Sequence, residues 1–310
     1  MAENFDYIII GAGAAGLTSG QYGARAGLKT LIIDSSSGGG QALQIAELEN
    51  YPGLFPLVSG SDFSEKMLEQ TKAFGTTVIQ DTVLSIDKIN DKFTVKTQKE
   101  EFQCYAVLIA TGAKHNTLQV PGEKELCGAG VSYCATCDGP FFKDKKIIVV
   151  GGGDSACSEA VYLSTISKDV TLIHRRGTLR AQKAVQDKLL NSGVTVRFNS
   201  QIESINGKNK VESVTLKDSE TENLSEIPAD AVFIFAGTTP VTDLVEMLPK
   251  DENGYLLTDE CMQTIIPGLY AAGDVRSKPF RQLVTAAADG ATAAFQATNY
   301  IHGQKLKKSL

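Results

Sequence analysis

Two cysteines separated by two residues, Cys134 and Cys137, are the side chains in this sequence best suited to chemistry. Thiols at this spacing can close a small disulfide ring, and a thiolate can reopen the ring by attacking sulfur. In such motifs the thiol pKa can fall to about 7, so thiolate is available at neutral pH. Asp138 follows directly, and its carboxyl could give or take protons if burial raises its pKa. We therefore predict a catalytic redox pair with Asp138 as its acid and base.

The same two cysteines have two less reactive interpretations, which are half of a zinc site or unpaired residues of the core. Zinc takes about four nitrogen or sulfur ligands, usually including a second close pair. The other cysteines and the histidines are scattered singly along the chain, as Cys104, His115, Cys127, Cys157, His174, Cys261 and His302. The ligand count therefore argues against zinc, and we expect no metal.

A glycine-rich fingerprint follows the first apolar run of the chain. Residues 7–10 predict a buried parallel strand, residues 11–16 form a full GxGxxG, and residues 14–26 suit a helix. A second apolar strand ends at Asp34, 23 positions after Gly11, near the spacing at which a carboxylate meets an adenosine ribose. The glycines permit a tight turn and close approach of the backbone to a pyrophosphate. This unit fits FAD, and the predicted contacts are Gly11, Gly13, Ala14, Ala15, Gly16 and Asp34.

A second fingerprint begins 140 positions later, directly after the apolar strand predicted at 146–150. Its next strand, 170–173, ends in a basic cluster where the first unit has a carboxylate. A carboxylate would select a free 2′-hydroxyl, whereas arginines accommodate a 2′-phosphate, so this unit fits NADPH. The alternative is that Arg175 and Arg176 are solvated residues at a strand end. The predicted contacts are Gly151, Gly153, Asp154, Ser155, Ala156, His174, Arg175, Arg176 and Arg180.

The two fingerprints are an internal repeat, and 310 residues suit two domains better than one. We predict an α/β protein with two Rossmann-like dinucleotide-binding domains. The NADPH-binding domain, residues 118–245, carries the CxxC and is inserted in a discontinuous FAD-binding domain formed by residues 1–117 and 246–310. Helices are predicted at 64–74 and about 282–302, and antiparallel strands at 76–79, 83–86 and 93–97. Strands of the second domain are also predicted at 194–198, 202–205, 211–216 and 231–235.

Composition narrows the possible partners and the compartment. A net charge of −6 provides no basic stripe for nucleic acid. The apolar run 5–16 is too short and too rich in glycine to span a membrane. Six cysteines in 310 residues are far too few for a disulfide scaffold, so we expect a cytoplasmic protein.

Further motifs carry a family resemblance along nearly the whole chain. These are Gly39-Gly40-Gln41, Glu49-Asn50-Tyr51-Pro52-Gly53, Ala110-Thr111-Gly112, the block 131–139 (Val-Ser-Tyr-Cys-Ala-Thr-Cys-Asp-Gly), His174-Arg175-Arg176, Ala272-Gly273-Asp274-Val275 and Arg281-Gln282-Leu283. With the first fingerprint, they resemble the bacterial-type, low-molecular-weight thioredoxin reductases, class II of the pyridine nucleotide-disulfide oxidoreductases. The resemblance implies further FAD contacts at Gly40, Gln41, Asn50, Ala110, Thr111, Gly112, Gly273, Asp274, Arg281, Gln282 and Leu283.

The resemblance also implies a homodimer whose protein substrate is thioredoxin. Electrons would pass from NADPH through FAD to the Cys134–Cys137 disulfide and then to thioredoxin, with rotation of one domain against the other. We expect Cys137, the neighbour of Asp138, to be the sulfur nearest the flavin.

Several other functions fit these residues less well. A redox-inert flavoprotein would leave the CxxC and the second fingerprint unexplained, and a ferredoxin–NADP reductase does not need Cys134 or Cys137. The reductase of a peroxiredoxin system usually carries an extra N-terminal redox domain, whereas here the first fingerprint begins at Gly11. A non-nicotinamide electron donor is disfavoured by Arg175 and Arg176. Reduction of another disulfide partner, as in a peroxiredoxin system, remains the alternative.

Overall fold

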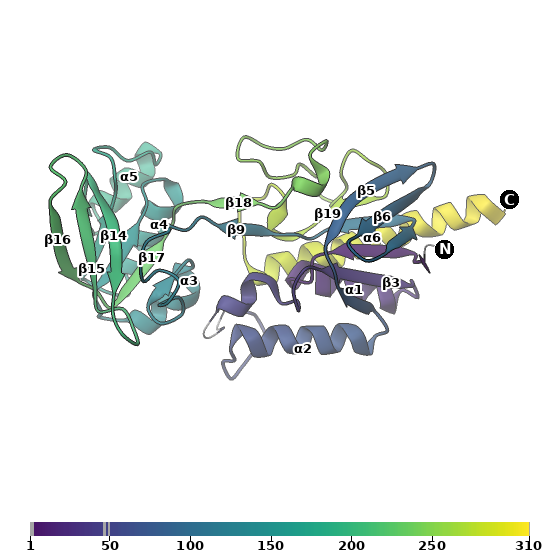
Figure 1. Cartoon of the computed structure of the whole chain (residues 1–310), viewed down its shortest axis with the longest axis horizontal. Coiled ribbons are helices and arrows are strands. Elements are labelled where there is room, and N and C mark those ends of the chain that lie inside the picture. The colour runs from purple at the N-terminus through teal and green to yellow at the C-terminus, as the bar shows by residue number, and fades with distance from the viewer. Residues whose placement is uncertain (1–2, 46–47, 49, 310) are drawn as a thin grey trace. The chain divides into compact units, whose positions relative to one another are not determined.

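The computed structural model describes residues 3–45, 48 and 50–309, which form two compact units (Figure 1). Unit 1 consists of Met1–Leu43, Tyr51–Lys114 and Thr239–Leu310, and unit 2 of Gln44–Asn50 and His115–Thr238. In Figure 1 unit 1 therefore holds both the purple and the yellow ends of the chain, and the larger segment of unit 2, His115–Thr238, is teal and green. Glu49 of the family motif lies outside the described residues.

Unit 1 is built on a five-stranded parallel sheet. Its strand order is β19-β8-β2-β3-β4, with β2 at Tyr7–Ile10, β3 at Thr30–Asp34, β4 at Thr77–Gln80, β8 at Ala106–Ile109 and β19 at Leu269–Ala271. The central strands are buried on both faces, which explains why they are apolar without interruption. Ile8 and Ile10 face one hydrophobic cluster and Tyr7 and Ile9 face another, because successive side chains of a strand point to opposite faces.

Helices cover one of these faces. They are α1 at Ala14–Arg25, α2 at Gly60–Ala73 and α6 at Leu283–Ser309. The other face packs against a sheet ordered β1-β7-β6-β5, with β1 at Glu3–Asn4, β5 at Val83–Ile89, β6 at Lys92–Thr97 and β7 at Glu101–Cys104. The antiparallel strands predicted at 83–86 and 93–97 are confirmed, since they correspond to β5 and β6, which pair antiparallel.

One strand prediction was wrong in its direction. The segment predicted as antiparallel at 76–79 is β4, which pairs in parallel with β3, Leu31 opposite Thr77 and Asp34 opposite Gln80. The physical reason is the helix α2, which lies between β3 and β4 in the sequence and returns the chain to the same end of the sheet, as a parallel connection requires. Alternating side chains therefore indicated the strand but not its partner.

Unit 2 repeats this arrangement. Its parallel sheet is ordered β10-β17-β11-β12-β13, with β10 at Val131–Ser132, β11 at Ile147–Val150, β12 at Val170–Ile173, β13 at Thr195–Arg197 and β17 at Ala231–Ile234. Ile147 and Val149 face the helices of this unit, and Ile148 and Val150 face a second, antiparallel sheet on the opposite side. The helices are α3 at Ala135–Asp138, α4 at Asp154–Ser164 and α5 at Lys183–Leu190. The predicted architecture, two α/β units with one inserted in the other, is confirmed.

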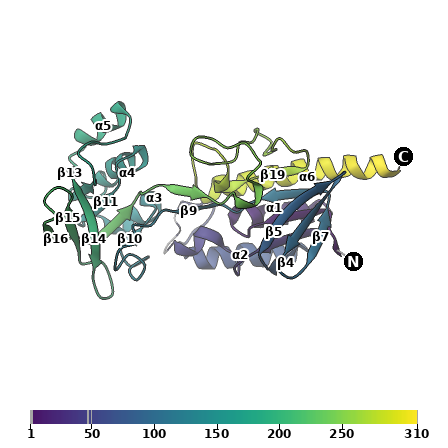
Figure 2. The same ribbon diagram turned by 45° about the horizontal axis from the view of Figure 1, so that its top comes forward.

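The second sheet of unit 2 is antiparallel and lies across the parallel sheet from α4 (Figures 1 and 2). It contains β14 at Ser200–Asn206, β15 at Ser213–Asp218 and β16 at Leu224–Pro228. The chain passes from unit 1 to unit 2 in β9 (Ala113–His115) and returns in β18 (Thr238–Pro240), and these two strands pair.

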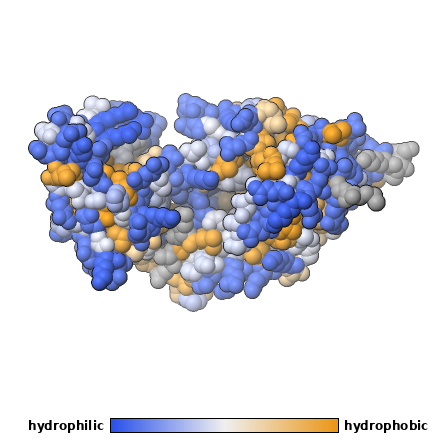
Figure 3. Space-filling view, in the orientation of Figure 1, coloured by the Kyte–Doolittle hydropathy of each residue, from blue (hydrophilic) through white to orange (hydrophobic). Residues whose placement is uncertain are grey.

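Short 3₁₀ turns occur at η1 (Gly40–Gln44), η2 (Gly139–Phe142), η3 (Asp243–Val245) and η4 (Gly273–Val275). On the face drawn in Figure 3, hydrophilic side chains cover most of both units and apolar ones form small patches. Within residues 3–45, 48 and 50–309, no helix is both long and apolar enough to cross a membrane.

Candidate active site

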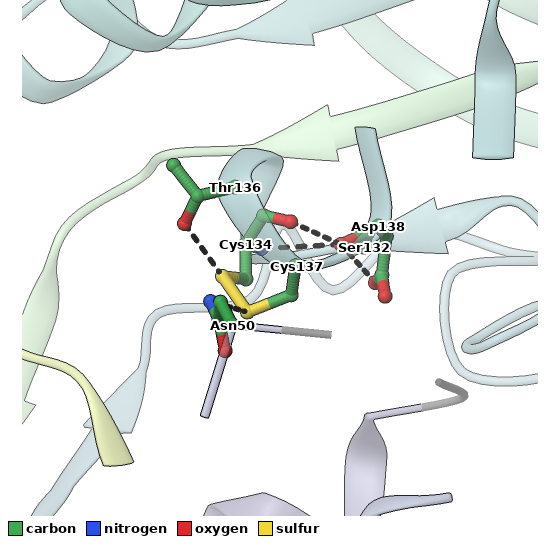
Figure 4. The surroundings of a disulfide bond; sticks show 6 residues. All are labelled: Asn50, Ser132, Cys134, Thr136, Cys137 and Asp138. Atoms are coloured by element: carbon green, nitrogen blue, oxygen red, sulfur yellow. Dashed lines mark hydrogen bonds between the residues drawn. A yellow bond between two sulfur atoms is a disulfide. The ribbon is translucent and has the colours of Figure 1, made fainter. Parts of the chain in front are cut away.

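The two cysteines of the CxxC form a disulfide at the start of α3 (Figure 4). Cys134 precedes the first turn of the helix in an extended conformation, and Cys137 lies one turn later. This turn brings their Cα atoms within 5.3 Å of each other, inside the range a disulfide needs. Cys137 is 6% exposed, whereas Cys134 is half-buried. Cys134 is therefore the more exposed of the two residues.

Asp138 follows Cys137 as the last residue of α3, and its carboxyl is in an environment suited to proton transfer. Its Oδ2 accepts a hydrogen bond from Ser132 Oγ at 2.6 Å, and its Oδ1 is buried with no hydrogen-bond partner among the described residues. Burial raises the pKa of Asp138, and the bond from Ser132 partly opposes that rise. Asp138 therefore keeps its proton to a higher pH than an exposed aspartate.

Three further polar side chains surround the disulfide (Figure 4). Ser132 Oγ also accepts a bond from the Cys134 amide at 3.1 Å, so one hydroxyl holds both the cysteine and the acid. Thr136 Oγ1 lies 3.5 Å from Cys134 Sγ, and Asn50 Nδ2 points at Cys137 Sγ from 3.9 Å. Sequence reasoning placed Asn50 among the flavin contacts and gave no role to Ser132 or Thr136. Their position inside the most specific motif was the signal that could have identified the latter two.

The first glycine loop, residues 11–16, is closely packed against other protein atoms at Gly11 and Gly16 and has free space at Gly13. Gly11 has φ +108°, and a Cβ on Gly16 would overlap the Gly11 carbonyl oxygen, so neither position accepts a side chain. A Cβ on Gly13, in contrast, would meet nothing within 4 Å. The open side at Gly13, next to the N-terminus of α1, fits a ligand phosphate.

Asp34 supports this loop from the end of β3. Its Oδ2 accepts a bond from the Ala12 amide at 2.6 Å, and its Oδ1 accepts two bonds of 2.7 Å from the amide and hydroxyl of Ser36. The acid predicted to meet a ribose thus also fixes the backbone of the glycine loop.

Several of the other predicted flavin residues pack against this loop or the start of α1, whereas Asn50 lies beside the disulfide in unit 2. Added Cβ atoms show close packing of Gly11 against Ala110, Gly40 against Gly13, and Gly273 against Ala15. Three more residues bond to neighbouring segments. The Gln41 side-chain amide donates to the Ala113 carbonyl, and Thr111 Oγ1 donates to the Val241 carbonyl at 2.6 Å. The backbone N–H of Gln282, just before α6, donates to Thr285 Oγ1 at 3.1 Å. Gly112 accepts a backbone bond from Val241, and Leu283 begins α6.

Two side chains of this group, Asp274 and Arg281, have a buried polar atom with no hydrogen-bond partner among the described residues. Asp274, in η4, has a buried Oδ1 that receives no hydrogen bond from the part of the chain that the structure describes. Such an oxygen fits a ligand hydroxyl, because a buried acceptor left without a donor is costly. The Arg281 guanidinium carbon lies 3.8 Å from the centre of the Tyr255 ring, a cation–π contact that fixes the arginine.

The second glycine loop has the same geometry. A Cβ on Gly151 would overlap Ala156, whereas one on Gly153 would meet nothing within 4 Å, so this loop also leaves room for a phosphate. Asp154 and Ser155 begin α4, and Asp154 Oδ1 accepts a bond from the Gln182 amide at 2.6 Å. The Arg180 amide donates to the Gly152 carbonyl at 2.7 Å, which joins the basic segment to the loop.

The basic cluster after β12 separates into one buried and three exposed side chains. His174 packs against Gly152, and its Nε2 lies 3.0 Å from the Thr178 carbonyl. Burial lowers the pKa of His174, so the ring is neutral at neutral pH. Arg175, Arg176 and Arg180 are exposed and can offer their charges to a phosphate. Positive charge at this site therefore comes from the arginines, whereas His174 packs against the second glycine loop at Gly152.

With this geometry described, comparison with known proteins identifies the class. The sequence pattern of the pyridine nucleotide-disulphide oxidoreductases matches residues 5–290. The chain therefore belongs to the pyridine nucleotide-disulphide oxidoreductase family.

Within this family the chain is similar to several thioredoxin reductases. That of Treponema pallidum (strain Nichols) is 48% identical over 302 residues, 97% of this chain and 98% of the relative. That of Listeria monocytogenes is 44% identical over 309 residues, 99% of this chain and 96% of the relative. The crystal structure of thioredoxin reductase from Streptococcus pyogenes has a TM-score of 0.92 at 41% identity, with 98% of this chain and 100% of that chain covered. The resemblance predicted from the motifs is confirmed.

Proposed function

We propose that this chain is an NADPH-dependent thioredoxin-disulfide reductase that uses FAD. The observation that supports it best is the Cys134–Cys137 disulfide, followed directly by Asp138 with its buried Oδ1, in a chain that also carries two glycine loops open to a ligand. A disulfide leaves no thiolate to ligate zinc, so the pair in this state suits redox chemistry.

Family membership implies a flavin and a pyridine nucleotide. We assign FAD to unit 1, where Gly13 leaves space for the pyrophosphate and Asp274 offers a buried acceptor. We assign NADPH to unit 2, where Gly153 leaves the corresponding space and exposed arginines suit a 2′-phosphate. When bound, the flavin supplies two-electron chemistry that can connect a hydride donor to a disulfide.

The chain's own residues perform the exchange with thioredoxin. Reduction of the Cys134–Cys137 bond takes two electrons and two protons and gives two thiols. The thiolate of Cys134, the more exposed cysteine, attacks a sulfur of oxidised thioredoxin and forms a mixed disulfide. Cys137 then attacks Cys134, which releases reduced thioredoxin and restores the ring. Asp138 supplies the proton that a departing thiolate takes up and accepts one from the next attacking thiol.

Thioredoxin-dependent oxidation of NADPH by the purified protein tests this function. The expected result is a yellow protein that consumes NADPH when oxidised thioredoxin is present, and only slowly when it is absent. A Cys134→Ser variant serves as the control for flavin reduction without exchange. Oxidation of NADPH with a peroxiredoxin system but not with thioredoxin would instead support the alternative partner, and a colourless protein that binds no flavin would refute the proposal.

Two further features belong to the same proposal. The reductases it resembles lead us to propose a homodimer, which sedimentation of the purified protein would test. Four of the six cysteines remain free, Cys104, Cys127, Cys157 and Cys261. Free thiols suit a reducing compartment, so we propose the cytoplasm as its location.

A further inference from the structure

A network of buried charges in unit 1 lies beside the proposed flavin residue Asp274. Lys278 Nζ lies 3.2 Å from Asp289 Oδ2 and 3.3 Å from Asp274 Oδ1, and Arg276 lies 3.4 Å from Asp289. The Lys278 side chain is only 5% exposed, and those of Asp289 and Arg276 are 12% and 13% exposed. None of these charges takes part in the proposed transfer of electrons or protons.

A lysine buried to this degree needs partners for its charge, because removing an ammonium group from water is costly. Lys278 has three N–H donors, and the structure gives it three oxygen neighbours: Asp289 Oδ2, Thr285 Oγ1 at 3.4 Å and Asp274 Oδ1. The approach to Asp274 is an ion-pair contact without hydrogen-bond alignment, so Asp274 Oδ1 still lacks a donor. Lys278 thus balances the charge of Asp274 without occupying its acceptor site.

The same network fixes the backbone that carries Asp274. Asp289, in the second turn of α6, accepts a bond from the Gly273 amide at 3.1 Å. Gly273 in turn packs against Ala15, at the start of α1, so that an added Cβ would lie 2.9 Å from the Ala15 Cβ. Lys278 and Asp289 therefore hold both the main chain at Gly273 and the carboxylate that follows it, next to the first glycine loop.

We propose that Lys278, bridged to Asp289, is a positioning residue that orients the Asp274 carboxylate to accept a hydroxyl of the FAD ribityl chain. This inference rests on the proposed assignment of FAD to unit 1. It gives a role to a lysine outside every fingerprint and motif of the sequence. Its consequence is that the affinity for FAD depends on Lys278 through Asp274.

A double-mutant cycle on the dissociation constant for FAD tests the link. The full chain is freed of flavin and titrated with FAD, and binding is followed by the loss of flavin fluorescence. Lys278→Met, which keeps the length of the side chain and removes its charge, should weaken FAD binding about tenfold, as expected for loss of one charge-assisted contact. Asp274→Asn should weaken binding to a similar degree. Because the lysine acts through Asp274, Lys278→Met should add little in the Asp274→Asn background.

Two controls separate this role from general damage to the fold. Lys29 forms an ion pair with Glu3 in which both side chains are 56% exposed, so Lys29→Met should leave FAD affinity unchanged. Lys278→Arg retains the charge and should recover most of the affinity. Should Lys278→Met fail to fold, Asp289→Asn, which keeps an acceptor oxygen for the Gly273 amide, tests the same network and should weaken FAD binding several-fold.

The outcomes distinguish the two proposals. If the unaltered chain binds no FAD, both the assignment of FAD to unit 1 and this inference fail. If the unaltered chain binds FAD, and Lys278→Met or Asp289→Asn binds it equally well, the inference alone is overturned. Independent, additive effects of Lys278→Met and Asp274→Asn would also overturn it, because the lysine would then act by another route.

Discussion

Ser132 donates a hydrogen bond of 2.6 Å to Asp138 from the last residue of β10, across the redox disulfide turn. The contact stabilises the ionised form of a carboxyl whose burial favours the neutral form. These opposing effects set the pH at which Asp138 can exchange its proton with the thiols. The pair is therefore a natural place to alter the pH dependence of the enzyme without touching a cysteine.

Ser132→Ala should raise the pKa of Asp138 further, because the bond that lowers it is lost while the burial remains. Steps that need the protonated acid should then persist to higher pH. In the pH profile of kcat/KM for thioredoxin, the alkaline limb should move to higher pH. Ser192→Ala is the matched control, since the Ser192 hydroxyl in the same unit donates to the Leu189 carbonyl, and its loss should leave the limb in place. Movement of the Ser132→Ala limb to lower pH would contradict the assignment.

Asp138 should also make stability depend on pH. A carboxyl whose pKa is raised by folding contributes stability that is fully present below its unfolded pKa, about 3.9. That contribution is lost as pH rises through the folded pKa, because the folded state then holds a buried charge. Asp138→Asn cannot ionise, so it should gain stability relative to the unaltered chain as pH rises from acid to neutral. Melting temperatures of both proteins across this range measure the effect, and a parallel pair of curves would refute it.

Serine at either Cys134 or Cys137 should abolish the exchange while sparing the flavin. Turnover with thioredoxin should fall at least about 10³-fold, because the second sulfur needed for exchange is missing. FAD should remain bound, and NADPH should still bleach it. Cys127→Ser is the control, since Cys127 is free and exposed in the same unit, and it should keep full turnover. Loss of flavin reduction in the serine variants would show that the proposed order of electron flow is wrong.

The two open glycines should report the cofactors separately. Gly13 and Gly153 have φ of −79° and −94°, which alanine adopts readily, and their added Cβ atoms meet no protein atom within 4 Å. Gly13→Ala should weaken FAD binding and Gly153→Ala should weaken NADPH binding, each with little change in the stability of the cofactor-free protein. Gly16→Ala should instead destabilise the fold by about 1–3 kcal/mol, because its Cβ overlaps the Gly11 carbonyl. Titration calorimetry and thermal melts would separate these outcomes.

Replacing Arg175 and Arg176 together with alanine should raise the KM for NADPH by roughly 10- to 100-fold, since charge-assisted contacts to a 2′-phosphate are lost. The KM for NADH should hardly change, because NADH has no such phosphate. Lys188→Ala, at an exposed position on α5, controls for the loss of surface charge. Equal effects on both nucleotides would mean that these arginines do not select the phosphate.

The sequence by itself determined the local parts of this protein. In each repeat, strand, glycine loop, helix and following strand lie within a few dozen consecutive residues, so their glycine spacing and apolar runs are readable directly. The CxxC is equally local, because one helical turn brings Cys134 and Cys137 to disulfide distance. These parts were enough to predict the fold class and the family.

Only the tertiary structure decided how distant segments meet. The segment 77–80 pairs in parallel with β3 because α2 returns the chain, which no side-chain pattern within the strand reveals. The pKa of Asp138 rises because the folded protein buries it, and Lys278 meets Asp289 because α6 packs beside η4. Burial and long-range contacts depend on the whole chain, whereas the fingerprints depend on neighbouring residues. For that physical reason the cofactor loops could be predicted from sequence, and the groups that hold and tune them could not.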